Sequence, residues 1–148
     1  MAALTRLVFD AERTLFNETV GSASFSIAIT PHSLAARHWH EGVPSPLQLE
    51  MAIDDVETAL MNERLAYAAR GELATSEPLL ASLPGLNTAG SCLSRDEVEL
   101  LFEHLASAAF AGHQPVASVA PTSGPPAAAL LILRECMHHL GFETISAP

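Results

Sequence analysis

Two histidines and a glutamate in the first third of the chain are residue types that bind metal ions. His38 and His40 are two positions apart, and Glu41 follows directly. On an extended strand, side chains two positions apart point to the same side, so both imidazoles could bind one ion. The sequence therefore predicts a zinc-type metal site at His38, His40 and Glu41, with Glu41 as third ligand or base. The competing interpretation is a polar connection whose histidines face water, because no second half of a metal-binding signature follows.

A second group of reactive side chain types lies between Arg134 and His139. On a helix, Glu135 and His139 would lie one turn apart. Cys136 would fall beside the buried stripe of that helix, where a thiol packs as a small apolar group more often than it acts as a nucleophile. We therefore expect a structural role for this group, unless its helix meets the first histidine pair in space.

A turn containing hydroxyl groups and prolines lies at 121–126 and leads into an expected helix. Helix N-termini bind anions through free amides, so Thr122, Ser123 and Gly124 are predicted ligand-binding residues. Trp39, beside the first histidine pair, is added to them as an aromatic candidate. The competing interpretation is simple helix capping for the turn, whose paired prolines lack amide protons, and core packing for Trp39.

The charge balance excludes several classes of partner. The chain has 17 acidic and 7 basic residues, a formal net charge of −10, and every basic residue is an arginine remote from the others in sequence. Binding to nucleic acid or to an anionic membrane requires clustered cations, so we expect neither partner. The absence of lysine also excludes Schiff-base chemistry, a lysine-bound pyridoxal phosphate and a P-loop.

The two cysteines, Cys92 and Cys136, are expected to be free thiols in a reducing compartment. No basic region followed by an apolar core opens the chain, and no apolar stretch is long enough to span a bilayer. The sequence therefore predicts a cytoplasmic protein.

The N-terminal part of the chain has the pattern of β-strands. Apolar and small polar residues alternate from Phe25 to Thr30, which is typical of a half-buried strand. Shorter strands are expected at Leu7–Phe9 and Thr14–Phe16, with a hairpin turn at Gly21. Residues 31–44 then form a connecting segment.

Helix signals dominate the remainder. Ser45, followed by Pro46 and Gln48, predicts a helix that runs to about residue 69, and Ser94 with Glu97 predicts a second helix that ends at Gly112. Residues 71–93 are expected to be irregular, with one short helix near 77–82. The last third predicts a strand at 116–120, a helix that opens at Pro125–Pro126 and a final strand at 142–146.

Together these signals predict one α+β domain spanning residues 1–148. Antiparallel strands come first, helices occupy the centre, and a strand-helix-strand unit ends the chain. One mixed sheet would join the N-terminal strands to the C-terminal strands.

Three functions remain open at this level. The absence of catalytic motifs and the strong acidity favour a non-catalytic interaction or accessory protein that binds a protein partner or forms a homodimer. A small metal-dependent enzyme or ligand-binding protein is the alternative. It would use His38, His40 and Glu41, with a further ligand from His104, His138 or His139. A pH-responsive binder is the third, because protonation of all seven histidines would reduce the net charge from −10 to −3.

Overall fold

The computed structural model describes residues 4–19, 24–113 and 120–148. Three strands open the chain, and each pairs antiparallel with the next. The alternation expected between Phe25 and Thr30 is present around Ala28, which is exposed between the buried residues Ile27 and Ile29. The predicted N-terminal strands are confirmed with shifted bounds, and the Gly21 turn lies outside the described residues. They are β1 (Leu4–Phe9), β2 (Thr14–Glu18) and β3 (Ser24–Ile27).

The segment after β3 is helical, although the sequence pattern indicated a connection. Helix α1 (Pro31–His38) begins at Thr30, whose side chain accepts a hydrogen bond from the Ser33 amide. The Ser33 hydroxyl accepts one from the Thr30 amide in return, which completes a capping box. Pro31 therefore starts a helix here, as proline at the first helical position often does, besides ending the strand.

The two longest predicted helices are confirmed with their capping boxes. Helix α2 (Pro46–Asn62) begins at Ser45, and helix α4 (Arg95–Ala111) begins at Ser94. Helix α2 is shorter than predicted. Residues 63–70 are not helical, and they cross the C-terminal end of the helix at 124–140.

Residues 71–94 contain two strands that the sequence did not predict. They are β4 (Gly71–Thr75) and β5 (Cys92–Ser94), with the expected short helix α3 (Pro78–Ala81) between them. In β4 three consecutive residues, from Leu73 to Thr75, are buried, and the strand lies inside the sheet between β1 and β6. A strand of this kind lacks the alternation by which a half-buried strand is recognised.

The end of the chain follows the prediction. Helix α5 (Gly124–Leu140) ends at Gly141, and strand β6 (Phe142–Ser146) follows directly. The strand predicted at 116–120 lies, except for its last residue, outside the described residues.

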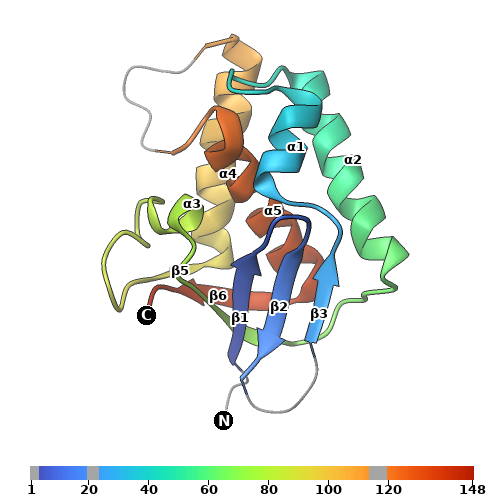
Figure 1. Cartoon of the computed structure of the whole chain (residues 1–148). Coiled ribbons are helices and arrows are strands. Elements are labelled where there is room, and N and C mark those ends of the chain that lie inside the picture. Colours follow the sequence, from blue (N-terminus) through green and yellow to red (C-terminus); the bar gives the residue numbers. More distant parts are fainter. Residues whose placement is uncertain (1–3, 20–23, 114–119) are drawn as a thin grey trace.

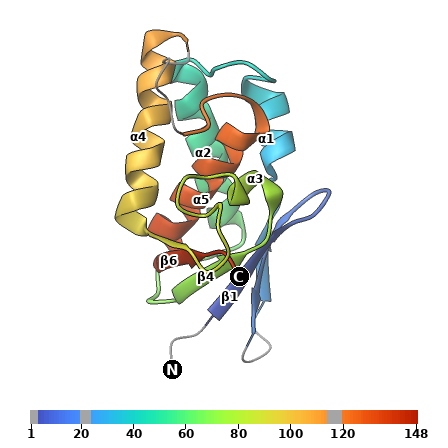
Figure 2. The ribbon, with the colours of Figure 1, turned by 90° about the vertical axis from the view of Figure 1, so that its left-hand side faces the viewer.

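The strands form one mixed sheet in the order β3-β2-β1-β4-β6-β5, which confirms the α+β fold class. Strands β1, β4 and β6 are parallel to one another, and the other pairings are antiparallel. The large helices all lie on one side of the sheet (Figures 1 and 2). The carboxyl ends of the three parallel strands therefore meet at one edge of the layer.

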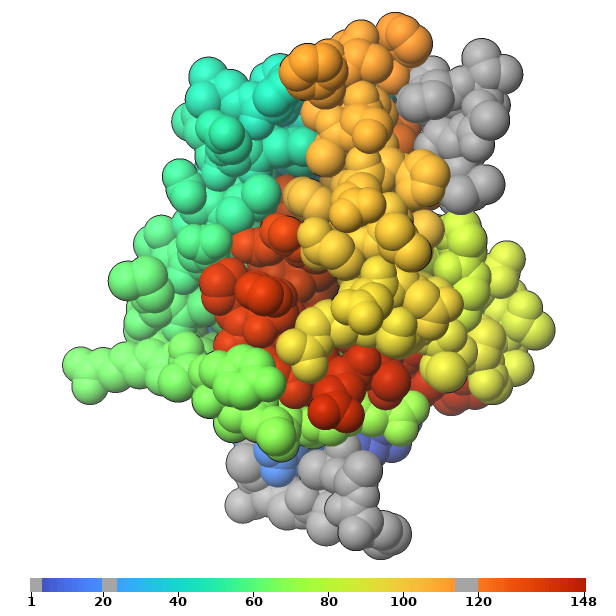
Figure 3. Space-filling view, turned by 180° about the vertical axis from the view of Figure 1, so that it is seen from behind, coloured from blue at the N-terminus to red at the C-terminus, as the bar shows by residue number. Residues whose placement is uncertain are grey.

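Helix α5 is the centre of the hydrophobic core. Its residues from Ala127 to Leu133 are all completely buried. Seen from behind, the visible part of α5, in red, lies between α2 in green and α4 in yellow (Figure 3). Within the described residues, no helix is both long and apolar enough to cross a bilayer.

The chain crossing after α2 depends on a glycine at the end of α5. Gly141 adopts φ +86°, and a Cβ at this position would collide with the carbonyl oxygen of Ala68. The amide of Arg70 donates to the Gly141 carbonyl at 3.2 Å, so the crossing segment is bound to this helix end. The turn that aligns β4 beside β6 therefore requires glycine.

We predict that Gly141→Ala destabilises the protein far more than Gly112→Ala. Both residues end a 17-residue helix with a positive φ, but a Cβ at Gly112 would meet no atom within 4 Å. Gly112→Ala should reduce the free energy of unfolding by about 1 kcal/mol from backbone strain alone, while Gly141→Ala adds the collision. Urea unfolding followed by circular dichroism measures both losses, and equal losses would contradict the crossing described here.

Candidate functional site

The carboxyl ends of the parallel strands are the natural place for a site in this fold. Open α/β sheets bind ligands outside these ends, where loops diverge. Here β1 ends at Phe9, β4 at Thr75 and β6 at Ser146, and the pairings place the three ends side by side. The side chains that follow these residues are therefore the first candidates.

The turn after β1 presents a carboxylate that is bound by its own backbone. Asp10 is exposed, and its Oδ1 accepts hydrogen bonds from the amides of Glu12 at 2.8 Å and Arg13 at 2.7 Å. These bonds lower the pKa of Asp10, so the group is ionised at neutral pH. Arg13 is not available to an anion at this turn, because its guanidinium binds Ser26 and Glu63.

The segment after β4 presents a second carboxylate. Glu77 Oε1 accepts a hydrogen bond from the amide of Phe9 at 3.0 Å, which joins the end of β4 to the end of β1. The buried Thr75 hydroxyl donates to the carbonyl of Leu7 and accepts from the Glu77 amide, each at 3.1 Å. Glu77 is thus held at the sheet edge by contacts with two strands.

A hollow of about 220 Å³ lies beside these residues, at the ends of β4 and β6. Neutral polar side chains line part of it, and none of the described residues around it has a charged side chain. They can hydrogen-bond a ligand without adding charge. The lining residues are Thr75, Ser76, Ala81, Leu86, Asn87, Thr88, Ala89, Ala147 and Pro148.

The residues predicted to bind a metal do not have the extended geometry on which that prediction depended. His38 lies at the end of α1, and its Nε2 is 2.6 Å from Asp55 Oδ2 on α2. His40 follows the helix with φ +55° and lines a separate hollow with Glu41. Because this segment is helix and turn, His38 and His40 are turned to different neighbours.

The residues predicted to bind a ligand lie next to that same segment. Trp39 is buried, and its Nε1 donates to the carbonyl of Gly124 at 3.0 Å. Thr122 is buried, and its hydroxyl has no hydrogen-bond partner within the described part of the chain. Ser123 is the N-cap of α5, yet its side chain makes no capping bond. The structure thus joins two segments that are 85 residues apart, and it gives Trp39 a packing role.

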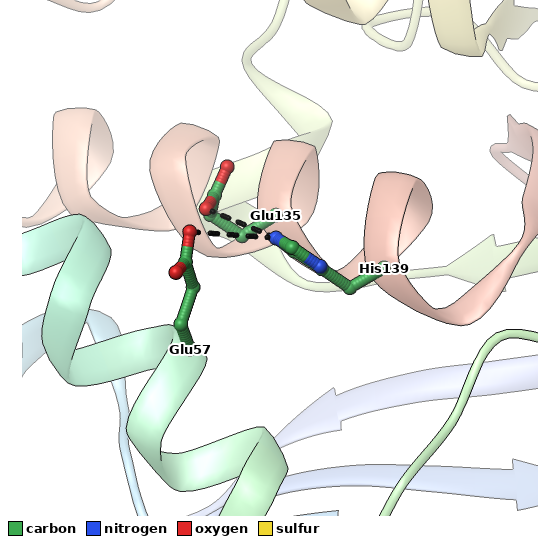
Figure 4. A group of neighbouring side chains, drawn as sticks. All are labelled: Glu57, Glu135 and His139. Atoms are coloured by element: carbon green, nitrogen blue, oxygen red, sulfur yellow. Dashed lines mark ion pairs between the residues drawn. The ribbon is translucent and has the colours of Figure 1, made fainter.

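A cluster of two carboxylates and an imidazole lies on the helical side (Figure 4). Glu57 comes from α2, and Glu135 and His139 come from α5. Burial raises the pKa of the Glu135 carboxyl, while Arg134 opposes that shift through an ion pair of 2.6 Å. The neighbouring Cys136 is completely buried, which raises the pKa of its thiol and accords with a packing role.

Sequence patterns did not indicate Asp10 or Glu77. Both follow strands that end at the same sheet edge, so recognising β4 as a strand would have drawn attention to the polar run from Thr75 to Glu77. The pattern of β4 gave no such signal, since three consecutive buried residues do not alternate.

Comparisons with known proteins find similarity in three dimensions only. No protein-family model matches the chain, and no curated protein is significantly similar in sequence. The structure of the Aquifex aeolicus PPX-GPPA enzyme matches with a TM-score of 0.69 at 9% identity. The type II variant of the A. aeolicus Ppx/GppA phosphatase matches with 0.70 at 10%, and an exopolyphosphatase from Cytophaga hutchinsonii with 0.67 at 11%. Each match covers 99% of this chain and 53% of the other.

The chain therefore has the fold of about half of these phosphatase structures, and identities this low establish the fold alone. This finding contradicts the prediction of a non-catalytic interaction or accessory protein, because the structures that share the fold are enzymes. The alternative of a small metal-dependent enzyme or ligand-binding protein stays a prediction. The homodimer stays a prediction.

The contact between α1 and α2 leads to a prediction about pH. Burial disfavours the charge on Asp55, but hydrogen bonds from His38 and Arg37 outweigh that effect and lower its pKa below the ordinary value of 3.8. A lowered carboxyl pKa contributes stability that is present above the ordinary value and is lost as the pH falls through the folded-state value. We predict that Asp55→Asn reduces the free energy of unfolding at pH 7 by about 1 kcal/mol.

The loss from Asp55→Asn should shrink as the pH falls below 3.8, because wild type then loses the same charge. Urea unfolding at several pH values measures it. Asp54→Asn, an exposed neighbour on the same helix, is the matched control. A loss of equal size at every pH would show that the charge on Asp55 is not responsible.

Proposed function

We propose that this chain forms one wall of a phosphatase cleft that acts on phosphoric esters or anhydrides. The fold supports the proposal, since the matching structures include a Ppx/GppA phosphatase and an exopolyphosphatase. The observation that carries it is the position of Asp10 and Glu77 at the carboxyl ends of adjacent parallel strands. The cleft would lie between this sheet edge and a second domain like the remainder of those structures.

The charge of the chain determines what this wall contributes. Phosphoryl transfer requires cations or amides around the phosphate and a base or acceptor that orients the attacking water. Near the strand ends this chain offers carboxylates, and the amides of Phe9, Glu12 and Arg13 are already bound by them. We therefore assign the water-orienting carboxylate to this wall, with Glu77 as the first candidate, and the phosphate-binding groups to the opposite wall.

The hollow beside Glu77 would receive the part of the substrate next to the reacting phosphate. Its hydroxyl and amide groups, from Ser76, Asn87 and Thr88, can hydrogen-bond that part without repelling or attracting charge. We place the protein in the cytoplasm, because Cys92 and Cys136 are free thiols.

We predict that magnesium pyrophosphate, used as a probe, binds next to the strand ends of this chain when the second wall is present to supply the phosphate-binding groups. In a titration followed by amide NMR, the largest shifts should fall on residues 9–13, 75–77 and 87–88. Amides on the exposed side of α2, such as that of Glu50, provide the internal reference. Shifts confined to other surfaces, or none at millimolar probe, would contradict the proposed cleft.

Glu77→Gln distinguishes the structural role of this side chain from its proposed catalytic role. The glutamine carbonyl can still accept from the Phe9 amide, so the melting temperature should change little, and removal of one negative charge should tighten binding of the probe. Phosphate release from polyphosphate or 4-nitrophenyl phosphate, with the second wall present, should fall by about a hundredfold or more. Glu50→Gln is the control, and equal rates in wild type and Glu77→Gln would exclude the assigned role.

A further inference from the structure

The cluster of Glu57, Glu135 and His139 is a second group with possible chemistry, and none of its residues lines the hollow at the strand ends. One potential ligand atom from each residue lies within 4.8 Å of the others. Figure 4 shows the His139 ring directed between the two carboxylates, one from each of two neighbouring helices. Carboxylate oxygen and imidazole nitrogen are both ligands of zinc.

His139 forms ion pairs with both carboxylates, and the spacing of these atoms leaves room for an ion between them. His139 Nε2 is 3.5 Å from Glu57 Oε1 and 3.6 Å from Glu135 Oε1. Both separations exceed the ordinary range for a hydrogen bond between nitrogen and oxygen. Ligands about 2.1 Å from a tetrahedral zinc ion are roughly 3.4 Å apart, so small side chain movements would complete the arrangement.

The burial of Glu135 gives an independent reason for a cation at this point. Its side chain is 2% exposed, and Arg134 binds only one of its oxygens, Oε2. The other oxygen, Oε1, faces the cluster and forms an ion pair with His139 at 3.6 Å. Ionisation of a carboxyl group in this buried position is costly, and a bound cation would offset that cost.

The surrounding charges also favour a divalent ion. Arg134 binds Glu99 through two nitrogens, at 2.7 and 3.1 Å, besides its bond to Glu135. The Arg134 guanidinium thus pairs with two carboxylates, those of Glu99 and Glu135, and Glu57 adds a third carboxylate close to Glu135. When all three are ionised and His139 is neutral, the group carries two net negative charges. Glu57 and His139 are about two-fifths exposed, so an ion can enter from solvent and keep water as a fourth ligand.

We propose that Glu57, Glu135 and His139 bind a zinc ion that joins α2 to α5. The imidazole ligand favours zinc over magnesium or calcium, which prefer oxygen ligands. The ion would stabilise the contact between the two helices, and this role is independent of the proposed phosphatase cleft.

The test uses zinc chloride and tag-free protein at pH 7.5. We expect calorimetry to show one zinc ion bound per chain. The melting temperature should rise by roughly 5 °C when free zinc is about a hundredfold above its Kd, and EDTA should reverse the rise. Cobalt(II) should give a visible absorption band that zinc abolishes.

Variants distinguish this site from non-specific binding. His139→Ala and Glu57→Gln remove partly exposed ligands, so both proteins should fold and lose the zinc response. His138→Ala, the adjacent exposed histidine on the same helix, should keep it. The proposal is overturned if wild type shows no stoichiometric zinc, if His138→Ala loses as much as His139→Ala, or if mild acid alone raises the melting temperature while zinc does not.

Discussion

Burial of helix α5 is the constraint on which the rest of the structure depends. From Ala127 to Leu133 this helix is apolar around its whole circumference, and such a segment is stable only when other elements surround it. Here α1, α2, α3, α4 and β6 all contact α5. Small residues in its first turns, Ala127 to Ala129, are completely buried and leave room for close approach. The one-sided stacking of helices on the sheet follows from this requirement (Figure 2).

The same burial explains where the charges lie. Glu135 belongs to the buried helix, so its carboxylate has to find partners at the edge of α5, where Arg134, His139 and Glu57 meet it. At the sheet edge, two further carboxylates are bound by backbone amides instead of cations. This acidic protein without lysine therefore presents negative groups both at the edge of α5 and at the sheet edge.

The fold could be predicted from the sequence wherever interactions between residues close together in the chain determine the local structure. Capping boxes at Ser45 and Ser94 placed two helices, because the side chains that satisfy the first amides lie within three residues. The sequence did not predict α1, because a proline after an alternating strand indicates the end of that strand, although Thr30 and Ser33 form an equally local cap. Nor did it predict β4, because three consecutive buried residues have no alternating pattern to distinguish a strand.

The sequence by itself determined the α+β class, the helix starts and the aliphatic core, since each depends on residues near one another in the chain. Only the tertiary structure decided which side chains meet. Glu77 reaches the amide of Phe9 across 68 residues, and Glu57 meets Glu135 and His139 across two helices. Such contacts arise from the packing of whole elements against α5 and from the register of parallel strands, and no local pattern of residues records either.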